Sequence, residues 1–134
     1  MKAKSPTRQR RRRRSKSIEL PAKFEPGFIR EIDQRSALAA RLRTSFSEVV
    51  EDIGGHKELS HTQLVLIERF VFLAETMRGW EVRIATKPKA SAELLSRWIQ
   101  ALNSLNGLAK AIGLKRKRKS VDDLQSYLKK AKAG

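Results

Sequence analysis

Two successive segments of the sequence repeat apolar residues at alternating spacings of three and four. The first stripe consists of Leu66, Phe70, Leu73, Met77, Trp80 and Ile84. The second consists of Leu95, Trp98, Leu102, Leu105, Ala109 and Ile112. A repeat of about 3.5 residues keeps every member on one face of an α-helix. Because a short connection with Pro88 separates the segments, we expect a helix from His61 and another from about Ser91, packed as an antiparallel hairpin.

The first hairpin helix carries a second apolar stripe beside the first one. Its members are Leu64, Ile67, Val71 and Ala74. A further helix, starting between Ile29 and Ser36 and ending at Ile53, can cover one of the two stripes. Its own apolar face is predicted from Leu38, Leu42, Phe46, Val49 and Ile53. The stretch before it, residues 18–28, is interrupted by prolines and reads as an extended strap that packs Phe24 and Phe28 on the body.

Helix-end signals agree with these boundaries. Gly54 and Gly55 can adopt the positive φ that ends a helix, and Gly113 has the same role after the third helix. Ser60 and Gln63 have the spacing of a capping box at the start of the second helix. Ser120 is expected to cap a short last helix. Its apolar residues Leu124, Tyr127 and Leu128 share one face. No strand-like alternation of useful length occurs, so the fold class is all-α.

The charge of the chain is concentrated at its two ends. The 134 residues include 30 Lys and Arg against 14 Asp and Glu, a net charge of +16. Residues 1–17 hold nine basic residues and no acidic one, and residues 115–134 hold eight basic and two acidic ones. Residues 18–114 are nearly neutral. We therefore expect a disordered basic tail over 1–17, a helical body over 18–114, and a basic run with the short helix over 115–134.

The basic ends predict binding to nucleic acid. Dense positive charge neutralises phosphates and releases counterions, and guanidinium groups bind phosphate with two parallel hydrogen bonds. The candidate nucleic-acid-binding residues are Arg8, Arg10, Arg11, Arg12, Arg13, Arg14, Lys16, Lys115, Arg116, Lys117, Arg118 and Lys119. No aromatic residue lies among them, so contact with the backbone of duplex DNA is favoured over RNA and over reading of single strands.

The wide apolar surface of the second helix also predicts self-association. A body of about 95 residues buries only part of such faces. The candidate oligomerisation residues are Leu66, Phe70, Leu73 and Met77. In the alternative interpretation, the first helix and the strap cover this surface within one chain.

No catalytic or metal-binding pattern occurs in the sequence. There is no cysteine, the only histidines are His56 and His61, and phosphate-loop, dinucleotide and hydrolase motifs are absent. We expect no enzymatic activity, no cofactor and no metal. Apolar runs are too short for a membrane span, and residues 1–17 lack the apolar segment of a secretory signal and the amphipathic pattern of a mitochondrial one. A cytoplasmic location is therefore expected.

The segment Ala101–Leu128, ALNSLNGLAKAIGLKRKRKSVDDLQSYL, resembles the C-terminal part of short helical phage and prophage proteins of the small terminase subunit type. In both, a leucine-rich helix end is followed by a basic run and a short helix. The resemblance implies a homo-oligomer that engages DNA, acts with a large terminase ATPase and works in a bacterial host cell. The run Arg10–Arg14 departs from that family, whose members more often begin with a helix-turn-helix.

Two other classes of protein remain open from the sequence. Ribosomal and nucleoid proteins also join basic tails to small helical bodies, which leaves an RNA- or ribonucleoprotein-associated structural protein as the main alternative. A partner-binding adaptor, in which the basic ends serve solubility only, is the other.

Overall fold

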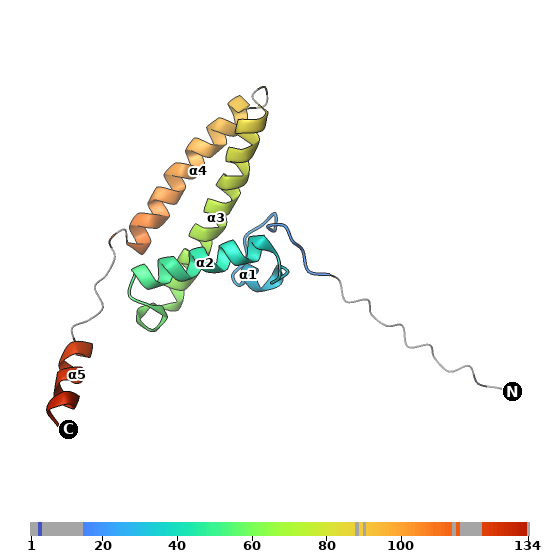
Figure 1. Ribbon diagram of the computed structural model, residues 1–134. Helices are drawn as coiled ribbons and strands as arrows, with labels where there is room; N and C mark the ends of the chain where they lie inside the picture. Colours follow the sequence, from blue (N-terminus) through green and yellow to red (C-terminus); the bar gives the residue numbers. More distant parts are fainter. Residues whose placement is uncertain are drawn as a thin grey trace.

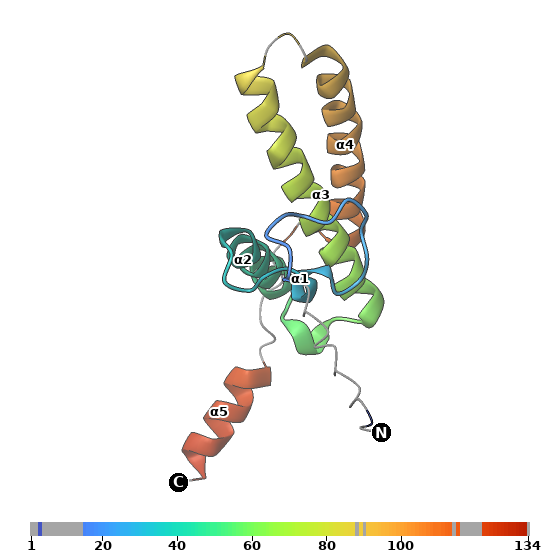
Figure 2. The same cartoon turned by 90° about the vertical axis from the view of Figure 1, so that its right-hand side faces the viewer.

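The protein is all-α and is built around an antiparallel helical hairpin (Figures 1 and 2). The computed structural model describes residues 15–87, 91–113 and 122–133, together with the single residues 3, 89 and 115. The hairpin consists of α3 (His61–Thr86) and α4 (Ser91–Ile112), which pack along each other. Within the described part no strand forms, and the one isolated bridge joins Ser17 to Ile32. The predicted fold class is confirmed.

The helix expected before the hairpin is present but divided. A single turn, α1 (Phe28–Glu31), precedes α2 (Ala37–Asp52), and a turn separates them. Ser36 is the reason for the new start, because its Oγ accepts a hydrogen bond from the Ala39 N–H at 3.1 Å. The main helix therefore starts at the late end of the predicted range, Ile29 to Ser36, with Ser36 as its N-cap, and its C-terminal end agrees with the prediction.

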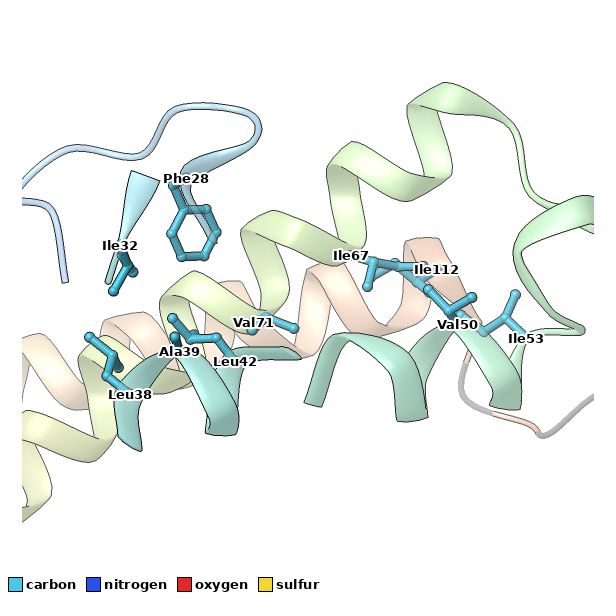
Figure 3. Packing of buried hydrophobic residues seen from close by; sticks show 10 residues of the cluster. All are labelled: Phe28, Ile32, Leu38, Ala39, Leu42, Val50, Ile53, Ile67, Val71 and Ile112. Atoms are coloured by element: carbon cyan, nitrogen blue, oxygen red, sulfur yellow. The ribbon is translucent and has the colours of Figure 1, made fainter. Parts of the chain in front are cut away.

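The core lies where α1, α2 and the first half of α3 meet (Figure 3). The two stripes of α3 are used on two sides, because α3 packs against both α2 and α4. Ile67 and Val71, from the second stripe, are almost completely buried in the cluster with Leu42. Ile112, at the end of α4, joins the same cluster. The prediction that a first helix covers one stripe is confirmed, and the stripe is the one that contains Ile67 and Val71.

The strap before α1 is fixed by three phenylalanine rings. Phe28 is 2% exposed, and its ring meets that of Phe72 edge to face at 5.2 Å between centroids. Phe24 makes the same kind of contact with both rings. The Arg69 guanidinium lies over the Phe24 ring at 4.9 Å and covers its outer face. The predicted packing of Phe24 and Phe28 on the body is confirmed.

Glycine and serine end and start the helices as expected. Gly54 and Gly55 have φ values of 119° and 94°, and Gly113 has 116°, all in the region that disfavours other residues. Ser60 and Gln63 form a complete capping box at the start of α3, after the short 3-10 helix η1 (His56–Glu58). The last helix is α5 (Asp122–Lys132). Its expected cap, Ser120, lies outside the described residues.

Candidate nucleic-acid interface

Two of the twelve predicted nucleic-acid-binding residues are described by the structure. Lys16 and Lys115 are both exposed. The other ten lie outside the described residues: Arg8, Arg10, Arg11, Arg12, Arg13, Arg14, Arg116, Lys117, Arg118 and Lys119.

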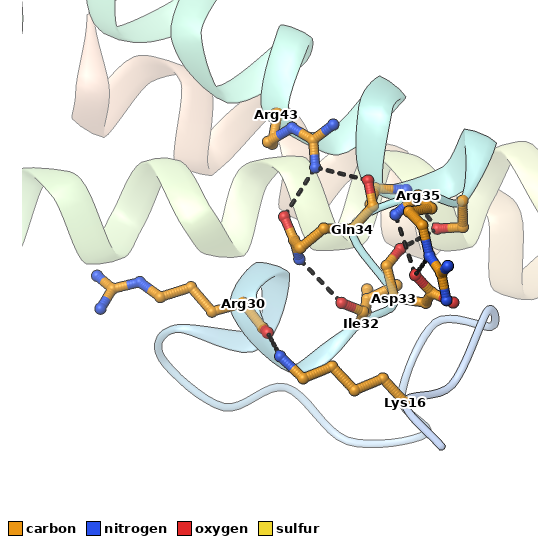
Figure 4. A network of polar contacts seen from close by, with 9 residues as sticks. Lys16, Arg30, Ile32, Asp33, Gln34, Arg35 and Arg43 are labelled. Carbon is orange, nitrogen blue, oxygen red and sulfur yellow. Dashed lines mark hydrogen bonds and ion pairs between the residues drawn. The ribbon is translucent and has the colours of Figure 1, made fainter.

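The end of the basic tail is attached to the body beside α1. The Lys16 Nζ donates a hydrogen bond to the Arg30 carbonyl at 3.0 Å (Figure 4). The Ser17 carbonyl accepts from the Asp33 N–H at 2.8 Å, and Ser17 also forms the bridge with Ile32. Residues 16 and 17 are therefore fixed next to the turn that joins α1 to α2.

A groove of about 680 Å³ opens next to this attachment point, between α1, α2 and the start of α3. We call it the N-terminal groove. Its basic lining residues are Arg30, Arg43, His56 and His61. Its apolar lining residues include Ile29, Phe46, Leu64 and Val65. The groove thus combines basic side chains with a phenylalanine, whereas residues 1–17 and the run Lys115–Lys119 contain no aromatic residue.

The Arg43 side chain is held in place by an amide instead of a carboxylate. Its Nη1 donates to the Gln34 Oε1 at 2.7 Å and to the Gln34 carbonyl at 3.2 Å (Figure 4). The Gln34 Nε2 in turn donates to the carbonyls of Ile29 and Ile32 at 2.6 and 2.9 Å. Because no partner in this network is charged, the Arg43 guanidinium is oriented while its positive charge stays uncompensated.

The Arg30 guanidinium has no acidic partner among the described residues, whereas several other arginines of the body do. Arg41, for example, binds the Glu75 carboxylate at 2.7 Å. The one carboxylate that lines the groove belongs to Glu68. Its Oε2 accepts from the Gly27 N–H at 2.8 Å and so helps to fix the strap. Arginine charges are therefore in excess in this groove.

Asp33 stabilises the turn between α1 and α2 on which Gln34 sits. Its Oδ1 accepts from the Arg35 N–H at 3.0 Å and lies 3.5 Å from the Arg35 Nε. The backbone hydrogen bond from Arg35 is the main cause that lowers the pKa of this carboxyl below 3.8, and the positive charges of Arg35 and Lys16 act in the same direction.

The predicted oligomerisation residues face inward along the hairpin. Met77 is 4% exposed, and Leu66, Phe70 and Leu73 are half-buried. Within one chain this stripe is therefore largely covered. Leu66 and Phe70 pack against the core cluster, which contains residues of α1 and α2 as well as Ile112 of α4.

A different apolar face is exposed on α4. Leu95 and Ile99 are 44% and 49% exposed, so Leu95, which the sequence placed in the stripe facing the other hairpin helix, lies on the outside instead. Helical periodicity places Ala92, Leu102, Asn103 and Asn106 on the same side. We call these six residues the outer face of α4. None of the six is charged, although one residue in three of the whole chain is charged.

Comparisons with models of known protein families, with curated proteins and with solved structures find no match. Among the residues that the structure describes, no helix has both the length and the apolar character to cross a lipid bilayer. Nor do three acidic or histidine side chains gather within the described ranges as a metal ion would require.

Proposed function

We propose that this chain is a non-enzymatic, oligomeric nucleic-acid-binding protein of the small terminase type, active in phage DNA packaging. The observation that supports nucleic-acid binding is the separation of charge. Nine basic and no acidic residues lie within 1–17, next to a body of almost no net charge. Such a tail gains free energy by releasing counterions from a phosphate backbone, without reading a sequence.

Duplex DNA is the proposed partner for the basic ends. The twelve basic residues Arg8, Arg10–Arg14, Lys16 and Lys115–Lys119 contain no interleaved aromatic, so they are suited to phosphates and not to stacking on bases. The resemblance of Ala101–Leu128 to small terminase subunits adds packaging, a large terminase ATPase as partner and the cytoplasm of a bacterial host. An RNA-associated structural protein is the alternative that the test below separates.

Self-association is proposed to use the outer face of α4. An exposed apolar helix face is unfavourable in a monomer. Each copy has a net charge of +16, and a face without charged residues allows two copies to meet there without local repulsion. In an isologous contact the same face lies on both sides, so an uncharged surface matches itself. Two hairpins joined in this way form a four-helix arrangement.

The experiment is a salt series with the full chain and with a variant that lacks residues 1–14. This deletion keeps Lys16 and Ser17, whose contacts with the body are described above. It removes eight basic residues, so the slope of log K against log salt should fall by roughly 4–7, at about 0.9 per phosphate neutralised. Arg83→Ala, an exposed single charge on α3, serves as the control and should change the slope by no more than about 1.

Each result has a clear reading. An unchanged slope after the deletion would reject nucleic-acid binding by the tail and favour the adaptor. Preference for a structured RNA over a duplex DNA at equal salt would favour the ribonucleoprotein alternative. A large-terminase or portal gene beside the gene for this chain would support packaging.

A further inference from the structure

We propose that the N-terminal groove binds one nucleotide unit of an unpaired nucleic-acid strand, with its phosphate at Arg30 and Arg43 and its base against Phe46. The proposal rests on nucleic-acid binding as the function. It adds a site on the folded body to the basic ends, and it assigns to that site a ligand that the basic ends are not built to select.

The arginines supply the phosphate half of the site. Two guanidinium groups line the groove, and neither has a carboxylate within ion-pair distance in the described part of the chain. Arg43 is already oriented by Gln34, which accepts two hydrogen bonds from its Nη1. An arginine that is oriented before binding loses less conformational entropy when it contacts a phosphate.

The apolar lining supplies the half that receives the base. Phe46 is half-buried on α2 and lines the groove, with Leu64 and Val65 of α3 in the same lining. A volume of about 680 Å³ lies within the range of sites that hold small molecules. A base stacked inside a duplex cannot enter such a groove, whereas an unpaired base can stack on an aromatic ring. The ligand is therefore an unpaired nucleotide.

Glu68 gives the groove a hydrogen-bond acceptor. One of its oxygens is occupied by the Gly27 N–H at 2.8 Å. The other is available to the exocyclic amino group of a base. A carboxylate repels a phosphate, so it favours the orientation in which the base, and not the phosphate, lies toward Glu68.

The groove lies next to the point at which the basic tail joins the body. Lys16 contacts the Arg30 carbonyl, which fixes the tail next to a groove residue. Arg14 is two residues before Lys16, and Arg10 is six before it, so they lie within about 7 Å and 22 Å of it at ~3.6 Å per residue. A strand whose phosphates follow the tail can therefore place its next nucleotide in the groove.

The test compares binding of a labelled oligodeoxyadenylate and of a duplex of the same length to the full chain and its variants. Arg30→Ala combined with Arg43→Ala should weaken strand binding more than the control Arg83→Ala, and should lower the salt slope by about 1–2. Phe46→Leu keeps apolar bulk but removes the ring, and should weaken strand binding roughly five- to hundredfold. Its effect on the duplex should not exceed that of the control.

Circular dichroism at equal concentration shows whether Phe46→Leu is folded, and the arginine pair keeps the test decisive if it is not. The groove assignment is overturned if the arginine pair behaves like Arg83→Ala. It is also overturned if Phe46→Leu, shown to be folded, weakens binding of the duplex as much as binding of the strand, because the ring would then not select an unpaired base. If these variants have no effect while deletion of residues 1–14 lowers the slope, the groove fails and the proposed function stands.

Discussion

The indole Nε1 of Trp98 on α4 donates a hydrogen bond to the Glu81 Oε1 on α3, at 3.0 Å. This bond joins the two helices in the distal part of the hairpin, away from the core around Ile67. Trp98 is half-buried, so its ring contributes apolar contact while its N–H has a partner at the surface. Trp80 and Trp98 belong to the two predicted stripes, and the polar partner of Trp98 is Glu81, the neighbour of Trp80 in the sequence.

Trp98→Ala should destabilise the protein by about 1.5–2.5 kcal/mol, since a fully buried large aromatic costs about 3–5 and this one is half-buried. Trp98→Phe keeps most of the ring and should lose only the hydrogen bond, about 0.5–1.5 kcal/mol. Urea unfolding followed by far-UV circular dichroism measures both. Glu81→Gln keeps an acceptor and is the matched control. A loss below about 1 kcal/mol for Trp98→Ala would mean that the end of the hairpin contributes little to folding.

The helices could be predicted because their signals are local. Spacings of three and four, the capping box at Ser60 and the glycines at Gly54 and Gly55 depend only on neighbours in the sequence. The division before Ser36 was not predicted. Apolar residues occur on both sides of this N-cap, as they would in one longer helix.

The candidate site could not be predicted in the same way. Arg30, Arg43 and His61 come from separate elements, and no spacing in the sequence links them. Phe46 fits the apolar stripe of its helix, but Val50 and Ala39 occupy the centre of that face in the fold. Which side of α2 meets α3 depends on tertiary packing, which the spacing of apolar residues does not reveal. Phe46 lies at the edge of the buried face and therefore lines the groove.

Ile67→Ala should be among the most destabilising single changes. Ile67 is completely buried between α2 and α3, and removing its branched side chain there should cost about 2–5 kcal/mol. Val82→Ala is the control, because Val82 is 57% exposed and should change the free energy of unfolding by no more than about 0.5 kcal/mol. Equal midpoints of thermal unfolding for the two variants would contradict the packing of α3 on α2.

Asp33 should contribute to stability at neutral pH and lose that contribution in acid. Its pKa is lowered in the folded state by the Arg35 N–H, so the folded protein prefers the charged carboxylate. The contribution is fully present above the unfolded pKa of 3.8 and is lost as the pH falls through the lower folded value. An NMR titration of the Asp33 side chain should show a midpoint below 3.8. In Asp33→Asn, this part of the pH dependence of the free energy of unfolding should disappear. A titration midpoint at or above 3.8 for Asp33 in the unmodified chain would contradict the contact with Arg35.

Leu95→Glu combined with Ile99→Glu should convert oligomers to monomers without unfolding the chain. Both side chains are exposed on the outer face of α4, so the carboxylates stay solvated in one copy, whereas an identical face brought against them would place like charges together. Val82→Glu is the matched control, since it adds the same charge at an exposed apolar position of α3. Leu73→Glu with Met77→Glu should instead unfold the hairpin, because Met77 is buried between α3 and α4. Light scattering after size exclusion gives the mass, and circular dichroism gives the helix content. If Val82→Glu lowers the mass while the α4 pair does not, the copies associate through another face of the hairpin.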